Sequence, residues 1–217
     1  MNNNLALSDY VDLDDKQARN KSILKMVIAF LVLAVSYELA PLITLSRKIK
    51  NVPIEILIYV AIAGIITYIG CYIGNTTKVT KKPIKLGKVT LTIFIVFIVL
   101  WLSLLIMNKV GLFKMPLLKI LDVFTLAIFG GIIEEVLFRE LIFNIFIEVF
   151  SKRKYLFVWA SLAESFCFAI FHFLNLTHQS LLSTLGQVII VFGTGLLITY
   201  IRLASNGIWL GMLFHIY

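Results

Sequence analysis

Long runs of apolar residues, separated by short polar or basic segments, make up most of the chain. A helix needs about 20 residues, at 1.5 Å per residue, to cross the ~30 Å apolar core of a bilayer. Runs of at least about that length lie at 23–46, 53–74, 89–107, 117–150, 155–175 and 181–201. The run at 117–150 is too long for a simple span, and Gly130 and Gly131 give it a place to bend. The pattern predicts an all-α, polytopic transmembrane helical bundle of about six or seven spans.

The polar segments divide the chain into three parts. Residues 1–22 are predicted to form a polar cytoplasmic tail, 23–116 three N-terminal transmembrane helices, and 117–217 a C-terminal helical core. The last apolar segment, Ile208–Tyr217, would make only about 15 Å of helix, half of what spanning requires. A helix that ended there in lipid would leave carbonyl groups without partners. We therefore expect the last span to be short or truncated.

Composition excludes an ordinary soluble domain. Hydrophobic residues make up 60% of the chain and charged residues 15%, whereas about a quarter of the residues of a soluble domain are charged. A net charge of +8 fits basic loops against an anionic leaflet, so the bilayer is the expected partner and nucleic acid is not. With alternating spans, the side of the N-terminus carries 13 Lys and Arg and the opposite side 6. This bias predicts a cytoplasmic N-terminus.

Candidate chemistry begins in the sequence GGIIEEVLFRE of residues 130–140. A charge at bilayer depth is costly, so it faces a protein interior or a wet cavity and is a candidate functional group. Glu135 and Arg139 are four residues apart on one helix face and can form an ion pair. Glu134 points about 100° away from Glu135 and is left available as a general base. The alternative is that these charges only hold helices together, without chemistry.

Two of the three histidines, His172 and His215, also lie in apolar segments. His172 shares a helix stripe with Glu164 and Phe168 at i+4 spacing. A carboxylate and imidazoles that converge can deprotonate water and stabilise an oxyanion. Two His and a Glu can also hold Zn²⁺, which makes Glu134, His172 and His215 metal candidates. Either histidine could instead be a satisfied interhelical hydrogen bonder, and a Ser/His/Asp triad or a Cys167 nucleophile has little support.

Glu134-Glu135-x-x-x-Arg139, Phe168-x-x-x-His172 and the C-terminal His215 together resemble the motifs of the CPBP family, which contains CAAX prenyl endopeptidases and bacteriocin-processing proteins. The resemblance covers roughly residues 117–217. It implies a multi-span intramembrane protease in which Glu134 activates water, assisted by His172. Glu135 and Arg139 would support the site, and His215 would bind the oxyanion together with the residue four positions later. That residue would be number 219, beyond Tyr217.

The expected function is an intramembrane endopeptidase that cleaves a membrane-associated peptide or protein, in bacteriocin maturation or self-immunity. The resemblance fits both a glutamate-type enzyme without a cofactor and a zinc enzyme. A non-catalytic membrane immunity or scaffold protein of the same fold is the main alternative. A small transporter with Glu38, Glu134 and Glu164 as proton carriers is a weaker one. The Lys-, Ile- and Asn-rich composition is typical of a bacterial chain, so the bacterial cell membrane is the expected location.

Overall fold

The computed structural model describes residues 16–44, 52–74, 95, 117–177 and 179–215. Every element in these residues is a helix, as the apolar pattern predicts. The elements are α1 (Lys16–Thr44), α2 (Val52–Gly74), α4 (Leu117–Glu134), η3 (Glu135–Ile142), α5 (Phe143–Val149), α6 (Leu156–Phe171), η4 (His172–Thr177), α7 (Leu181–Ser205) and α8 (Trp209–His215). Apart from Ile95, the expected span at 89–107 lies outside the described residues, as does most of the expected tail.

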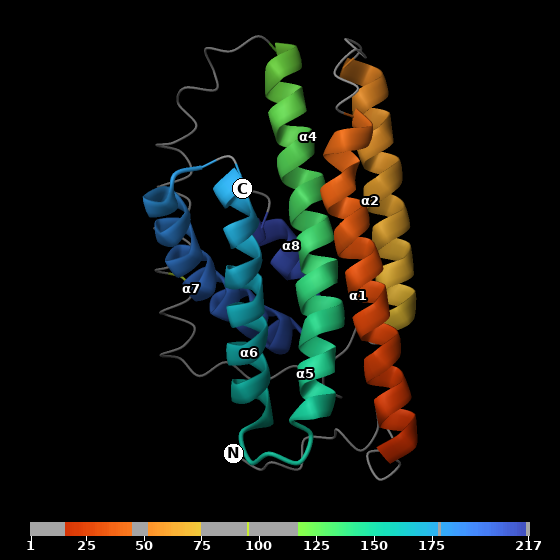
Figure 1. The fold of residues 1–217 in the computed structure, drawn as a ribbon, viewed down its shortest axis with the longest axis vertical. Coiled ribbons are helices and arrows are strands. Elements are labelled where there is room, and N and C mark those ends of the chain that lie inside the picture. Colours follow the sequence, from red (N-terminus) through yellow and green to blue (C-terminus); the bar gives the residue numbers. More distant parts are fainter. Residues whose placement is uncertain (1–15, 45–51, 75–94, 96–116, 178, 216–217) are drawn as a thin grey trace.

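A continuous helix formed by α4, η3 and α5 is the centre of the fold (Figure 1). The expected bend at Gly130 and Gly131 is absent, because α4 continues through both glycines to Glu134. Gly131 serves a different purpose, since a Cβ there would lie 3.0 Å from the carbonyl oxygen of His215. The helix instead widens into a π-helix over η3. Segments of π-helix are rare and often mark functional sites.

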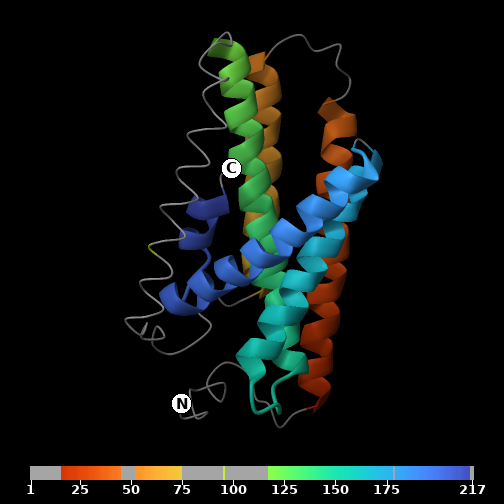
Figure 2. The same ribbon diagram turned by 90° about the vertical axis from the view of Figure 1, so that its left-hand side faces the viewer.

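Helices α1 and α2 pack side by side against the central helix, and α6 and α7 lie on its other side (Figures 1 and 2). Buried apolar residues of α1, α2 and η3, among them Leu33, Ile66 and Phe138, form the larger core cluster. Gly70 of α2 allows close packing here, because a Cβ at this position would collide with the side chain of Val136. The core thus fixes η3 against α1 and α2, and it extends to Phe168 of α6.

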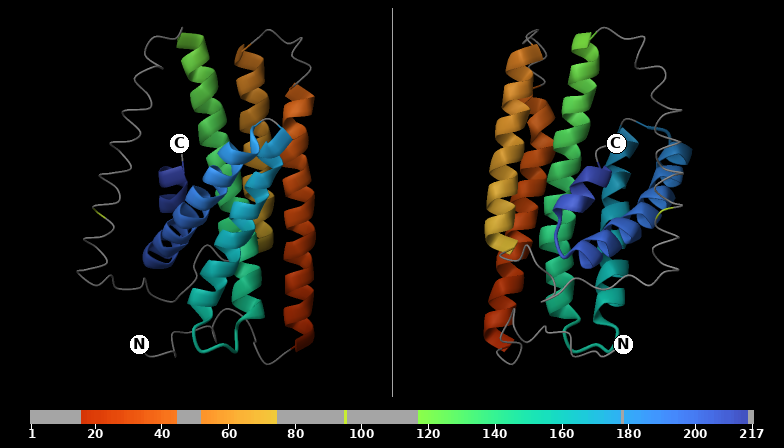
Figure 3. Two further views of the ribbon diagram at one scale, coloured as in Figure 1. Left: turned by 60° about the vertical axis from the view of Figure 1, so that its left-hand side comes forward. Right: turned by 180° about the vertical axis from the view of Figure 1, so that it is seen from behind.

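The α6–α7 pair brings α8 toward the central helix. Gly195 of α7 faces Ser165 of α6, since a Cβ at Gly195 would lie 3.1 Å from that of Ser165. Asn206, in the left-handed conformation (φ 56°), ends α7, and α8 then runs beside α4 and α7 (Figure 3). Other glycines of these helices make no such contact. At Gly64, Gly186 and Gly193 a Cβ would meet no atom of the described residues within 4 Å.

Two helical segments of the described residues are long and apolar enough to cross a membrane. They are Leu156–Thr177, with 22 residues, and Leu181–Ser205, with 25. At 1.5 Å per residue each reaches or exceeds ~30 Å if wholly α-helical. The outer face of α7 is strongly apolar, with Leu182 81% and Ile189 73% exposed. These helices agree with the predicted membrane protein, whereas the number of about six or seven spans stays a prediction.

Candidate active site

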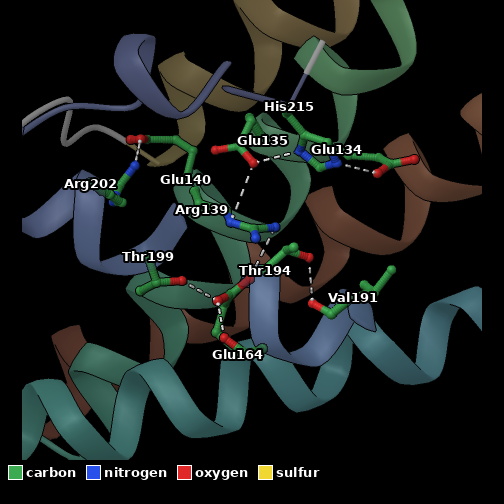
Figure 4. Close-up of polar contacts among 11 residues, drawn as sticks. Glu134, Glu135, Arg139, Glu140, Glu164, Val191, Thr194, Thr199, Arg202 and His215 are labelled. Carbon is green, nitrogen blue, oxygen red and sulfur yellow. Dashed lines mark hydrogen bonds and ion pairs between the residues drawn. The ribbon is translucent and has the colours of Figure 1, made fainter. Parts of the chain in front are cut away.

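The π-helix η3 places several charged side chains in the interior of the molecule. Glu135, Arg139 and Glu140 are all fully buried. A buried charge is costly unless it is paired and hydrogen-bonded. Partners should therefore lie on the helices packed around η3, and they come from α6, α7 and α8 (Figure 4).

Arg139 lies between two buried carboxylates. Its Nε is 3.4 Å from Oε1 of Glu135, the ion pair expected from the i, i+4 spacing. One terminal nitrogen is 3.4 Å from Oε1 of Glu164 on α6. The guanidinium also stacks over the ring of Phe168, 4.3 Å from its centroid, a cation–π contact. Arg139 thus links η3 to α6, because its guanidinium interacts with a carboxylate on each of them.

Glu164 is held in turn by two hydroxyl groups. Thr199 of α7 donates a hydrogen bond of 2.6 Å to its Oε2, and Ser165 donates one of 3.2 Å to the same oxygen. The sequence places Glu164 on the stripe of Phe168 and His172 but does not reveal its pairing with Arg139. Its charge inside an apolar span marks Glu164 as a candidate functional residue in the sequence. Thr199 and Ser165 are uncharged, and nothing in the sequence marks them in this way.

His215 of α8 bridges the two adjacent glutamates. Its Nε2 lies 3.1 Å from Oε2 of Glu134, and its Nδ1 lies 2.7 Å from Oε1 of Glu135. A neutral imidazole has only one N–H donor, and an ionised carboxylate can only accept. Two such hydrogen bonds therefore require an extra proton, either on the imidazole or on one carboxyl group. The Glu134–His215–Glu135 unit therefore carries one proton more than a neutral imidazole between two ionised carboxylates.

Access separates the members of this unit. The side chain of Glu134 is 18% exposed and that of His215 16%, whereas Glu135, Arg139 and Glu164 are fully buried. Water can therefore reach Glu134 and His215 but not the ion pairs behind them. The buried oxygen Oε2 of Glu135 has no hydrogen-bond partner among the residues that the structure describes, and it faces Gly211 of α8.

His172 and Phe168 stand beside this unit. His172 begins η4 and donates from Nδ1 to the backbone carbonyl oxygen of Phe168 at 3.0 Å, which leaves its Nε2 as the acceptor of a neutral ring. The imidazole lies within electrostatic range of Glu134. The ring of Phe168 meets those of His172 and His215 edge-on, at centroid distances of 4.8 and 5.4 Å. Phe168 thus offers an apolar surface that both histidine rings contact.

Zinc is one of the expectations from the sequence, with Glu134, His172 and His215 as its candidate ligands. Among the described residues, no group of three or more His, Cys, Asp or Glu side chains could hold a metal ion. The physical reason is that both ring nitrogens of His215 contact carboxylates and Nδ1 of His172 contacts a backbone carbonyl. In this arrangement the three residues do not fit a metal site.

A second buried ion pair lies next to the first one along η3. Arg202 of α7 donates to Oε2 of Glu140 at 3.0 Å and to Oδ1 of Asn144 at 3.2 Å. Sequence reasoning assigned no role to these residues. Arg202 also lies in the last turn of α7, and its carbonyl oxygen accepts a hydrogen bond from the backbone of Gly207. This pair therefore anchors the connection that leads to α8 and His215.

Gly211 offers a direct test of how tightly α8 packs on Glu135. In Gly211→Ala the new Cβ would lie 2.5 Å from Oε2 of Glu135 and 3.0 Å from Cγ2 of Ile198. Overpacking of this kind costs about 1–3 kcal/mol, so we expect a lower melting temperature. In Gly193→Ala the Cβ meets nothing within 4 Å, and alanine is the better helix former, so a small increase is expected. If Gly211→Ala melted at the same temperature as the unchanged protein, the close contact of Gly211 with Glu135 and Ile198 would be contradicted.

The C-terminal part of the chain matches a known family. A model described as type II CAAX prenyl endopeptidase Rce1-like matches residues 116–217, and no curated protein or solved structure matches the chain. The matched segment runs from the start of α4 to beyond α8 and contains the glutamates that contact Arg139 and His215. Residues 116–217 are therefore similar to the Rce1-like CAAX prenyl endopeptidases, which confirms the resemblance to the CPBP family over this part of the chain.

Proposed function

We propose that the chain is an intramembrane endopeptidase that hydrolyses a peptide bond of a membrane-associated peptide or protein with water activated by Glu134. At the family level, the match to residues 116–217 supports a membrane endopeptidase of the CAAX-protease type. One observation on the site supports the role of Glu134 most. Of the glutamates gathered around Arg139 and His215, Glu134 keeps accessible side-chain surface, while Glu135 and Glu164 have none.

The reaction needs a base for the water, a donor for the oxyanion and an acid for the leaving amine. Glu134 takes a proton from water, and the hydroxide attacks the carbonyl carbon of the substrate. The C–N bond then breaks, and the proton from water passes to the amine nitrogen. His172 assists at the water through its Nε2, since its Nδ1 is held by the carbonyl of Phe168.

His215 is assigned to the oxyanion, with Glu135 as its positioning residue. When water and substrate enter, Glu134 separates from Nε2 of His215, and this N–H becomes free to donate to the carbonyl oxygen. The contact of 2.7 Å between Nδ1 and Glu135 keeps the ring oriented meanwhile. A buried carboxylate orients the histidine of serine proteases in the same way.

Arg139 and Glu164 position Glu135. Two carboxylates flank the guanidinium, each at 3.4 Å, so its charge is balanced from both η3 and α6. Thr199 extends this chain of contacts to α7. The network fixes Glu135, and through it His215, without touching the substrate.

A non-catalytic membrane immunity or scaffold protein of the same fold is the second candidate. The contact of His215 with Glu134 favours it, because both groups are occupied while this contact lasts. A proton transporter is less favoured, since Glu164 is fully buried and paired with Arg139 and Thr199. The side chain of Glu38 lies outside the described residues. The role in bacteriocin processing or self-immunity stays a prediction.

Cleavage by the purified full-length chain in liposomes tests the proposed function. The substrate is a fluorogenic peptide that ends in a prenylated CAAX sequence, and the same peptide without the prenyl group is the control. We expect release of the C-terminal residues, faster from the prenylated peptide because it partitions into the membrane. Failure to cleave either peptide would favour the non-catalytic candidate.

A chelator arm of the same assay tests the metal question. Because the nitrogens of His215 are held by two carboxylates, we expect the rate to be unchanged by EDTA or 1,10-phenanthroline. A loss of activity that added Zn²⁺ restores would show that Glu134, His172 and His215 rearrange around a metal.

A further inference from the structure

An apolar groove runs along α1 and α2 and shares no lining residue with the candidate active site. Its volume is about 480 Å³, comparable to that of small-molecule pockets. On α1 its wall is formed by Leu24, Ile28 and Val32, which follow one another at i+4 spacing and share a helix face. They are 59%, 52% and 58% exposed. Ile69 and Ile73 of α2 form the opposite wall.

One end of the groove is basic. Lys21 and Lys25 line it there, and the Nζ of Lys25 lies 5.7 Å from the centre of the exposed ring of Tyr72 on α2. Both lysine side chains are exposed. Among the described residues, no lysine lines the rest of the groove. Along α1 the lining is therefore cationic near the N-terminal end of the helix, at Lys21 and Lys25, and apolar from Ile28 onward.

Contacts between helices place this basic end at the edge of the apolar region. Ser22 donates a hydrogen bond of 2.8 Å to Glu148, the penultimate residue of the central helix. The exposed turn that follows, between α5 and α6, carries three more cations at Lys152, Arg153 and Lys154. The start of α1 and this turn lie at the same end of the molecule (Figures 1 and 2). The membrane-capable helix α6 begins directly after this turn.

The length of the groove matches one leaflet of a bilayer. Lys21 and Val32 are 11 residues apart, which corresponds to about 16 Å along a helix. Half of the ~30 Å hydrocarbon core is about 15 Å. Basic residues next to a membrane segment attract anionic headgroups of the adjacent leaflet. A ligand with an anionic head and an apolar chain of one leaflet's length therefore fits the groove in both charge and size.

We propose that this groove binds an anionic phospholipid. The headgroup phosphate lies against Lys21 and Lys25, and one acyl chain runs past Leu24 and Ile28 to Val32. The bound lipid fills the space between α1 and α2, whose other faces pack on η3. This site is independent of the chemistry at Glu134.

Lipid titration of the full-length chain in detergent, followed by native mass spectrometry, tests the proposal. The probes are phosphatidylglycerol and phosphatidylcholine with identical acyl chains. We expect one phosphatidylglycerol per chain to bind at least tenfold more tightly than phosphatidylcholine. Each lysine next to an anionic headgroup contributes about fivefold in affinity, so Lys21→Ala with Lys25→Ala should weaken binding about thirtyfold.

Two further variants separate the groove from general basicity. Lys152→Ala with Arg153→Ala removes the same charge at the same end but outside the groove, and should leave the tight site intact. Ile28→Trp keeps both lysines and narrows the apolar wall, so it should weaken phosphatidylglycerol binding. Equal losses in the two charge variants would overturn the site, because binding would then follow net charge alone. Equal affinity for phosphatidylcholine, or full displacement by soluble glycerol phosphate, would overturn it as well.

Discussion

Glu134→Gln is expected to lower the rate of peptide cleavage by about 10³-fold, within the range that general base catalysis contributes. Glutamine has nearly the same shape and can still accept a hydrogen bond from Nε2 of His215, so the fold should not change. It cannot take a proton from water, which is the step assigned to this side chain. The measurement is the initial cleavage rate in liposomes, together with the melting temperature in detergent.

Glu148→Gln is the matched control for this substitution. Glu148 lies on the same continuous helix, nine residues after Arg139, is largely buried and accepts a hydrogen bond from Ser22. The same chemical change there should leave the cleavage rate within about twofold of the wild type. If Glu134→Gln kept wild-type activity with an unchanged melting temperature, Glu134 would not be the base.

Local spacing predicts the parts of the site that lie on a single helix. The ion pair of Glu135 and Arg139 follows from i, i+4 geometry alone, and it is present at 3.4 Å. The side-by-side placement of Phe168 and His172 follows in the same way. These contacts need no knowledge of how the helices pack, so one sequence is enough to predict them.

Contacts between helices were beyond such reasoning. Thr199 is 35 residues from Glu164, and nothing in the apolar run of α7 distinguishes it from Thr194, whose hydrogen bonds within the described part of the chain go to its own helix backbone. The π-helix was equally hidden, because a widened turn depends on packing around η3 rather than on local propensity. The glycines show the same limit. Gly195 and Gly193 look alike in sequence, but only Gly195 faces a neighbouring helix closely.

Arg139→Met is expected to be the most destabilising of the single substitutions considered. It removes the guanidinium that lies between Glu135 and Glu164 and leaves both carboxylates buried. Breaking a buried ion pair from one side costs about 3–5 kcal/mol. For a chain of this size, that corresponds to a melting temperature lower by roughly 6–20 °C. Thermal unfolding in detergent, at one lipid concentration, measures the shift.

A second substitution shows whether the loss comes from unpaired charge. Arg139→Met combined with Glu164→Gln removes one of the two stranded carboxylates, so the double variant should be more stable than Arg139→Met alone. Arg202→Met is the matched control, since Arg202 is a fully buried arginine paired with a different carboxylate, Glu140. It should also unfold at a lower temperature, but Glu164→Gln should not rescue it, because the two ion pairs share no residue.

Rescue of both arginine variants, or of neither, would show that Glu164 is not the specific partner of Arg139. Rescue of Arg139→Met alone would establish that α6 holds the arginine from the side opposite to Glu135, and that Glu164 belongs to the support of the site although it stands outside the EExxxR and FxxxH motifs.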